Sequence, residues 1–211
     1  MLEGIEVLYH SSIRIEKEGH VIYFDPYGIK EEVNDADIIF CTHSHYDHFS
    51  EEDILKVKNE DTIIVATVDL EGKIKKLGFK DEQKILVLPK KKYSIAGIMV
   101  ETVPAYNVDK EFHKKEFDWV GYVITLDGNR YYVAGDTDVN DDNRLVKCDV
   151  AFLPVGGTYT MTATEAAGLA NTIKPKIAVP THYAGIVGEM VDAEEFEHML
   201  NASIKCVKYI K

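Results

Sequence analysis

The chain contains few cysteines and no long apolar run. Only three of its 211 residues are cysteine. They are widely spaced, odd in number and flanked by apolar residues, which argues against a disulfide framework or a CxxC metal knot and predicts buried free thiols. No apolar stretch approaches the roughly 20 residues of a membrane span, and residues 1–6 lack the basic and apolar regions of a secretory signal. We therefore expect a cytoplasmic protein without a membrane segment. The three thiols are Cys41, Cys148 and Cys206.

Basic side chains are outnumbered as well. Lysine and arginine total 24 against 36 acidic residues, which gives a formal net charge of -12. A field of this sign repels polyanions, so no nucleic-acid partner is expected. The densest basic cluster, Lys90-Lys91-Lys92, is predicted to be a solvated turn between two strands. The expected partner is a small molecule, and association between copies of the chain stays open.

No linker, low-complexity segment or close repeat divides the sequence, so we predict one domain over residues 1–211, built from two αβ halves. In the first half, apolar runs at 5–9, 12–16 and 20–24 predict an antiparallel meander, with a turn at Glu18-Gly19-His20. The unbroken apolar run 37–41 predicts a strand buried on both faces. Ser50 is the predicted N-cap of the first helix.

The remaining segments alternate between the hydrophobic period of a strand and that of a helix. Expected strands are 62–66, 84–88, 98–103, 119–126, 131–134, 150–153, 177–179 and 204–209, and expected helices are 69–76, 164–173 and 193–200. Both halves begin with meander-like strands and end with αβ units. This order favours an α/β (α+β) fold, a four-layer αβ/βα sandwich of two mixed sheets with helices on the outer faces.

A dense cluster of metal-binding side chains follows the buried strand 37–41. Four of the six residues at positions 43–48 are possible metal ligands, namely His43, His45, Asp47 and His48. Imidazole and carboxylate together are the ligands of metals that keep an open position for water. The alternative, a polar surface loop with histidines by chance, does not account for this density. The pattern HxHxDH therefore predicts a metal centre.

The chain resembles the metallo-β-lactamase superfamily of metallohydrolases. Four motifs in the same order carry the resemblance: Phe24-Asp25-Pro26, the HxHxDH loop, Ala134-Gly135-Asp136-Thr137 and Pro180-Thr181-His182-Tyr183. The compact size and Leu8-Tyr9-His10-Ser11-Ser12 look most like the branch that contains ascorbate-6-phosphate lactonase and uncharacterised bacterial and archaeal hydrolases.

The resemblance implies one or two divalent metal ions, with zinc as the first choice and manganese or iron as alternatives. His43 and His45 would bind the first ion, and Asp47, His48 and His182 the second. Asp136 would bridge the two, because a carboxylate between two cations offsets their repulsion.

One position departs from the family pattern. Where the family presents a third histidine for the first ion, this chain has Asn107, in Pro104-Ala105-Tyr106-Asn107. An asparagine oxygen is a poorer ligand for zinc than imidazole. Three outcomes are open: Asn107 binds the metal weakly, His113 replaces it, or only the second site fills.

Three further residues have predicted roles beside the metal. His10 is predicted to contact the substrate or a ligand. His113 is either a solvent-facing histidine or a substrate or proton-transfer group. Asp25 either orients a ligand histidine through its second ring nitrogen or caps a turn with Pro26.

The resemblance implies hydrolysis by a metal-activated hydroxide that Asp47 orients, with His10 or His113 protonating the leaving group. The predicted substrate is a small ester, lactone or phosphodiester metabolite. Two alternatives are a nuclease or cyclic-nucleotide phosphodiesterase, and a metal-binding protein whose degenerate site has no turnover. The fold alone does not decide among them.

Overall fold

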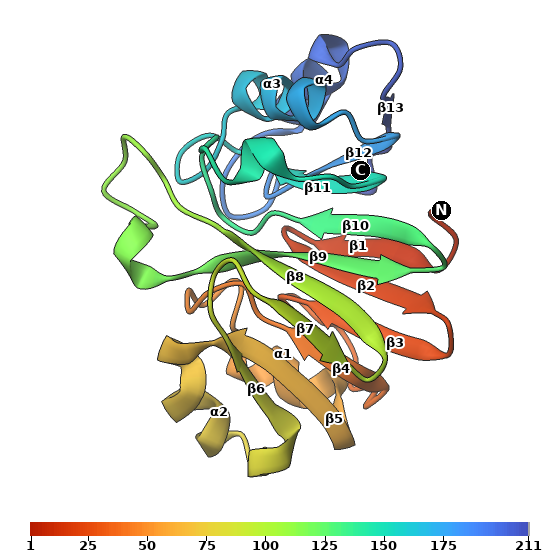
Figure 1. The fold of residues 1–211 in the computed structure, drawn as a ribbon, viewed down its shortest axis with the longest axis vertical. Helices are drawn as coiled ribbons and strands as arrows, with labels where there is room; N and C mark the ends of the chain where they lie inside the picture. The colour runs from red at the N-terminus through yellow and green to blue at the C-terminus, as the bar shows by residue number, and fades with distance from the viewer. Residues whose placement is uncertain (211) are drawn as a thin grey trace. The chain divides into compact units, whose positions relative to one another are not determined.

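The computed structural model describes residues 1–210 and divides the chain into two compact units. The N-terminal unit comprises residues 2–88, and the C-terminal unit comprises Met1 and the chain from Pro89 onward. Each unit has its own mixed β-sheet and its own helices (Figure 1). That both belong to one domain stays a prediction.

The sheet of the N-terminal unit has six strands in sequential order. The first three are antiparallel, as predicted, and the last four are parallel to one another. Glu18 and Gly19 form the predicted turn between the second and third strands, both with positive φ. The strands are β1 Ile5–Tyr9, β2 Ser12–Lys17, β3 His20–Phe24, β4 Ala36–Phe40, β5 Lys58–Thr67 and β6 Lys84–Val87.

Two short helices, α1 (Glu51–Val57) and α2 (Glu71–Lys76), cover one face of this sheet. Ser50 is the N-cap of α1, because its hydroxyl accepts the backbone N–H of Asp53 at 3.2 Å. The apolar cluster beneath the helices includes Ile39 of β4, Cys41 directly after β4, and Ile54 and Ile74 of the helices. The alternate residues of β4, such as Ile38 and Phe40, are also buried. A strand buried on both faces explains the unbroken apolar run.

The sheet of the C-terminal unit has seven strands in the order β13-β12-β11-β10-β9-β8-β7. Strands β7 to β10 pair antiparallel, and β10 to β13 pair parallel. The strands are β7 Lys92–Ile95, β8 Ile98–Pro104, β9 Val120–Leu126, β10 Asn129–Val133, β11 Val150–Pro154, β12 Ile177–Thr181 and β13 Lys205–Cys206.

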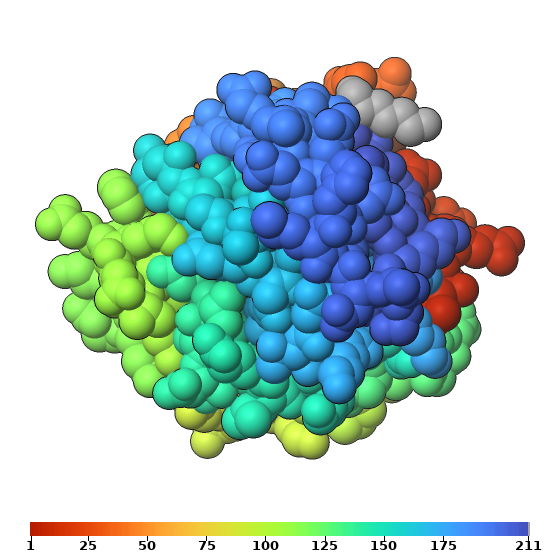
Figure 2. Space-filling view, turned by 90° about the horizontal axis from the view of Figure 1, so that it is seen from above, coloured from red at the N-terminus to blue at the C-terminus, as the bar shows by residue number. Residues whose placement is uncertain are grey.

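Helices α3 (Ala163–Ile173) and α4 (Met190–Met199) lie beside β11 to β13 in Figure 1. The buried faces of these helices share one apolar cluster with Leu153, Ala178 and Phe196. Figure 2 shows this side of the unit, where the chain from α3 to the end of α4 forms a continuous surface. The predicted pair of mixed sheets with helices is confirmed.

One strand was missed and several predicted boundaries were wrong, including the start of β5 at Lys58 rather than 62 and of α4 at Met190 rather than 193. Residues 92–95 were not predicted as a strand, but they form the edge strand β7, so the predicted turn contains Lys90 and Lys91 and ends before Lys92. The predicted strand 204–209 pairs only at Lys205–Cys206. The predicted helix 69–76 begins with a 3-10 turn at Val68–Leu70.

The thiols and the helices bear on two further predictions. All three cysteines are free, as predicted, but only Cys41 is fully buried, while Cys148 and Cys206 are partly exposed. Burial raises the pKa of the Cys41 thiol well above its usual value. None of the helices within residues 1–210 is long and apolar enough to span a membrane.

Candidate metal centre

The N-terminal set of polar side chains lies at the carboxyl ends of two neighbouring parallel strands. Phe24 and Phe40 are paired at the ends of β3 and β4, and the chain continues into Asp25 and into the HxHxDH loop. The backbone N–H of Asp25 donates to the carbonyl of Phe40 at 2.9 Å. Parallel pairing therefore places the Asp25 carboxylate beside the loop that starts at Thr42.

Asp25 orients His48 directly. Its Oδ2 lies 2.7 Å from His48 Nδ1, so the carboxylate accepts that ring N–H and the His48 Nε2 lone pair points away from it. The hydroxyl of Thr42 donates to the same oxygen at 2.7 Å, and the Thr42 backbone N–H donates to Oδ1 at 2.8 Å. Burial raises the pKa of Asp25, and the contacts with His48 and Thr42 oppose that rise. Asp25 therefore contacts a histidine of the HxHxDH loop, and the role of His48 as a metal ligand stays a prediction.

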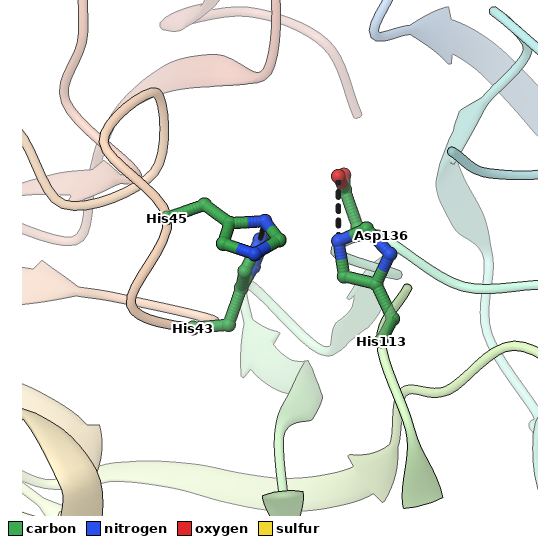
Figure 3. Close-up of side chains that lie close together, drawn as sticks. All are labelled: His43, His45, His113 and Asp136. Atoms are coloured by element: carbon green, nitrogen blue, oxygen red, sulfur yellow. Dashed lines mark hydrogen bonds and ion pairs between the residues drawn. The ribbon is translucent and has the colours of Figure 1, made fainter. Parts of the chain in front are cut away.

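Through Thr42, the Asp25 carboxylate also orients His43. Because the Thr42 hydroxyl donates to Asp25, it accepts from the Nδ1–H of His43, 3.0 Å away. His43 then has an unprotonated Nε2, the form in which imidazole binds a metal. That nitrogen lies 3.1 Å from Nδ1 of His45, and Figure 3 shows the two rings meeting edge to face.

His10 and Asp47 are the other members of the N-terminal set. His10 follows β1 in a left-handed conformation with φ of 52° and is completely buried. Its Nε2 lies 3.4 Å from Asp47 Oδ2, and the same oxygen lies 3.5 Å from His48 Nε2. The prediction that His10 contacts a ligand candidate agrees with this geometry.

The C-terminal set also occupies strand ends. Asp136 follows β10 and His182 follows β12, the two strands that flank β11 and run parallel to it. His182 Nε2 lies 3.1 Å from Asp136 Oδ2, and both side chains are almost completely buried. The structure thus brings together two residues that are 46 positions apart in the sequence.

His113 joins the same carboxylate. Its Nε2 lies 3.3 Å from Asp136 Oδ2, as the dashed line in Figure 3 marks. His113 is 1% exposed, so the solvent-facing alternative was wrong. It lies in the loop between β8 and β9, and its ring centre is 5.5 Å from that of Trp119.

Asn107 is buried but faces a different set of atoms. Its amide nitrogen donates to the carbonyl of Tyr159 at 2.7 Å and lies 3.3 Å from His113 Nδ1. Its backbone N–H donates to the His113 carbonyl at 2.8 Å. Within residues 1–210 the side-chain oxygen has no hydrogen-bond partner. Asn107 therefore holds the His113 loop in place.

The donor separations within each unit fit a small divalent cation. Two ligands at 2.0–2.1 Å from a tetrahedral zinc lie about 3.3 Å apart. The pairs His43–His45, Asp136–His182 and Asp136–His113 lie at 3.1, 3.1 and 3.3 Å. A hydrogen bond gives similar distances, so the residue types, one pair of imidazoles and two imidazole–carboxylate pairs, add the chemical argument for a metal.

Several residues of these networks were not predicted from the sequence. Thr42 connects Asp25 to His43, and its position directly before the HxHxDH loop was the available signal. Lys110 and Asp138 contact each other beside the His113 loop. Nothing in their sequence context separates them from other charged loop residues.

Comparisons with known proteins agree with the motif order. A family model described as a β-lactamase superfamily domain matches residues 4–182. The UPF0173 metal-dependent hydrolase of Pyrococcus abyssi is 30% identical over 217 residues, covering 96% of this chain and 94% of that protein. The crystal structure of a protein from Parabacteroides distasonis, described as a metal-dependent hydrolase by similarity, has a TM-score of 0.82 and 31% identity to this chain. The match covers 98% of this chain and 93% of that one.

A more distant structure shares the fold. Igni18, a metallo hydrolase from the archaeon Ignicoccus hospitalis, is 22% identical with a TM-score of 0.78, covering 97% of this chain and 93% of that one. The chain belongs to the β-lactamase superfamily, and within it to the metal-dependent hydrolases of the metallo-β-lactamase group. Its similarity to the ascorbate-6-phosphate lactonase branch stays a prediction.

Proposed function

We propose that this hydrolase acts on a small ester, lactone or phosphodiester metabolite, and that the candidate ligands of each unit bind divalent metal. The N-terminal set is His43, His45, Asp47 and His48, and the C-terminal set is Asp136, His182 and His113. The observation that carries the proposal is the single oxygen Asp136 Oδ2, which lies within 3.3 Å of an imidazole nitrogen from each of His113 and His182. The family match over residues 4–182 covers both sets and supports a metal-binding role for each of them.

In this proposal His113 is the third ligand of the first ion, in place of Asn107. His113 Nε2 faces Asp136 Oδ2, so the two side chains would hold an ion together. The amide nitrogen of Asn107 donates to the carbonyl of Tyr159. Its neutral amide oxygen is a weaker ligand for zinc than an imidazole nitrogen. Asn107 then acts on the metal only through the position of His113.

The remaining chemistry comes from Asp47 and from His10, both in the N-terminal unit. A bound divalent ion supplies Lewis acidity, and with it a water of lowered pKa and a polarised substrate oxygen. Asp47 Oδ2 is placed to accept a proton from the attacking water and to fix its direction. His10 Nε2, 3.4 Å from that oxygen, can exchange the proton with Asp47 and deliver it to the leaving group. The net charge of -12 supports a small substrate over a polyanion.

The proposal is tested by metal content and hydrolysis in the same samples. We expect the purified protein, dialysed against excess zinc or manganese, to bind two ions per chain and to hydrolyse at least one of a p-nitrophenyl ester, a lactone and bis-p-nitrophenyl phosphate. His113→Ala should lose one ion, Asn107→Ala should keep two at saturating metal, and Asp47→Ala should lose hydrolysis by roughly 100-fold or more. His198→Ala removes an exposed histidine of α4 and is the matched control.

Each result separates the alternatives. Two ions in His113→Ala would exclude His113 as a ligand. Bound metal without hydrolysis of any of the three substrates would favour a metal-binding protein without turnover. RNA or DNA association that weakens steeply with salt would favour a nuclease.

A further inference from the structure

The loop that carries His113 has little regular structure of its own. It joins β8 to β9 over residues 105–119 and contains one 3-10 turn, Lys115–Phe117. His113 itself has a φ of 53°, a left-handed conformation that a histidine seldom adopts. A side chain in such a loop keeps its position only where other contacts fix the backbone on both sides of it.

Asp138 supplies such contacts with both of its carboxylate oxygens. One oxygen, Oδ2, accepts the backbone N–H of Val108 at 3.0 Å. The other, Oδ1, contacts the ammonium group of Lys110, which also donates to the carbonyl of Thr160 at 2.8 Å. Lys110 therefore joins the His113 loop to two other segments of the C-terminal unit.

Asp138 is itself fixed relative to Asp136. Its backbone N–H donates to the carbonyl of Tyr106 at 3.2 Å, and its own carbonyl accepts from the side chain of Asn143 at 2.8 Å. Since Asp138 lies two residues after Asp136, a loop attached to Asp138 is attached to the segment that carries the carboxylate facing His113.

We propose that Lys110 and Asp138 form a clamp that positions His113 against Asp136 and so sets the metal affinity of the His113 site. Both are positioning residues, because neither touches the proposed metal or substrate. This inference rests on the proposed function, in which His113 is a ligand. The pair is mostly buried: the side chains are 25% and 11% exposed. Removing one partner of a buried pair leaves the other charge uncompensated, whereas an exposed pair contributes little.

The experiment measures zinc binding rather than turnover. Trp119 is the only tryptophan of the chain, and its ring lies 5.5 Å from that of His113, so its fluorescence reports on this loop. Metal-free full-length protein is titrated with zinc in a competing chelator. In Lys110→Met we expect the zinc ion whose binding changes Trp119 emission to have a dissociation constant at least about 10-fold higher than in the wild type. The affinity for the other zinc ion should be unchanged. Lys110→Arg should recover part of the affinity.

The chain offers a matched control. Lys90 makes an ion pair of 2.6 Å with Asp142 in the same unit, but its side chain is 63% exposed. Lys90→Met should titrate like the wild type. Asp138→Asn, which keeps the side-chain shape, should weaken binding of the same zinc ion and serves where Lys110→Met does not fold. Loss of the Lys110–Asp138 ion pair lowers the metal-free melting temperature of these two variants, but each should remain folded at the temperature of the titration, which circular dichroism checks.

Two outcomes are distinguishable. If His113→Ala abolishes the zinc-dependent change in emission but Lys110→Met and Asp138→Asn bind zinc as the wild type does, the clamp is wrong and the proposed ligand set stands. If His113→Ala leaves the titration unchanged, the ligand role of His113 fails, and the clamp inference fails with it.

Discussion

The buried carboxylate of Asp25 controls the protonation of two histidines. It accepts from His48 directly and, through the Thr42 hydroxyl, determines which nitrogen of His43 carries a proton. An amide at this position cannot accept from all three donors, because half of its polar atoms are themselves donors. The carboxylate is therefore required for both histidines to present unprotonated Nε2 atoms.

We expect Asp25→Asn to weaken zinc binding by about 10- to 100-fold, the usual effect of removing a hydrogen-bond partner of a ligand histidine. Chelator competition measures it. Asp37→Asn is the control, since Asp37 also accepts a backbone N–H, from Val21 at 2.7 Å, but at an exposed site of the same unit. Equal affinities for Asp25→Asn and the wild type would mean that neither histidine depends on this contact.

Residue types alone predicted most candidate ligands but not how His113 is used. The HxHxDH density and the motif order predicted the candidate ligand histidines and Asp136. His113 was ambiguous because its burial depends on a left-handed backbone and on contacts from Tyr159 and Asp138, which lie 46 and 25 positions away. Neither feature has a local sequence signal.

The loop after β11 approaches β12 closely at one glycine. A Cβ at Gly156 would lie 2.3 Å from the carbonyl oxygen of His182, nearer than any real contact of this kind. Because the obstacle is backbone, the strand end that carries His182 would have to move. In contrast, a Cβ at Gly168 in α3 would meet nothing within 4 Å.

Gly156→Ala should therefore lower the free energy of unfolding by about 1–3 kcal/mol through overpacking and should also weaken zinc binding through His182. Gly168→Ala should raise the free energy of unfolding by about 0.5–1 kcal/mol, because alanine is the better helix former, and leave zinc binding unchanged. Urea unfolding of metal-free protein and zinc titration measure the two effects. A Gly156→Ala variant with wild-type stability would show that the loop adapts without moving His182.

Elements with a clear period were predictable from the sequence, and the two sheet edges were not. The unbroken apolar run predicted β4, and Ser50 predicted the start of α1; both lie close to their predicted bounds in the structure. Strand β7 is an edge strand with a lysine at its start, a composition that resembles a turn. At the other edge, Val207 still donates to Ala178 at 3.0 Å, but the ladder of β13 ends at Cys206. Sheet neighbours, rather than local sequence, decide where such strands stop.

For the whole chain, the order of the motifs carried more information than any single motif. Asp136 alone is an ordinary loop residue, and His182 alone is a single histidine. Their positions after an HxHxDH loop predicted the superfamily, which the match over residues 4–182 confirms. The substrate has no comparable signature, because a hydrolase fold hosts many chemistries and loop shape decides among them.

The stability of the whole molecule should depend on pH in the alkaline range. Burial raises the pKa of Cys148 to about 12, of Cys206 to about 11, and of Tyr23 and Tyr183 to about 12. Unfolded thiols lose their protons near pH 8.5 and unfolded tyrosines near pH 10. Above these values the unfolded state binds fewer protons than the native state, so the free energy of unfolding falls as pH rises. The contribution of each group is complete below its unfolded pKa and is lost by its folded pKa.

We therefore expect the melting temperature of metal-free protein to be nearly constant from pH 7 to 8 and to fall progressively from pH 9 to 11 at fixed ionic strength. The double variant Cys148→Ala/Cys206→Ala isolates the two partly exposed thiols, because it leaves Cys41 and every carboxylate and tyrosine in place. Its melting temperature should fall less steeply than that of the wild type above about pH 8.5, where thiols of the unfolded chain lose their protons before most tyrosines and lysines do. Identical slopes for the two proteins would mean that the native thiols ionise as readily as the unfolded ones, and that burial does not protect them.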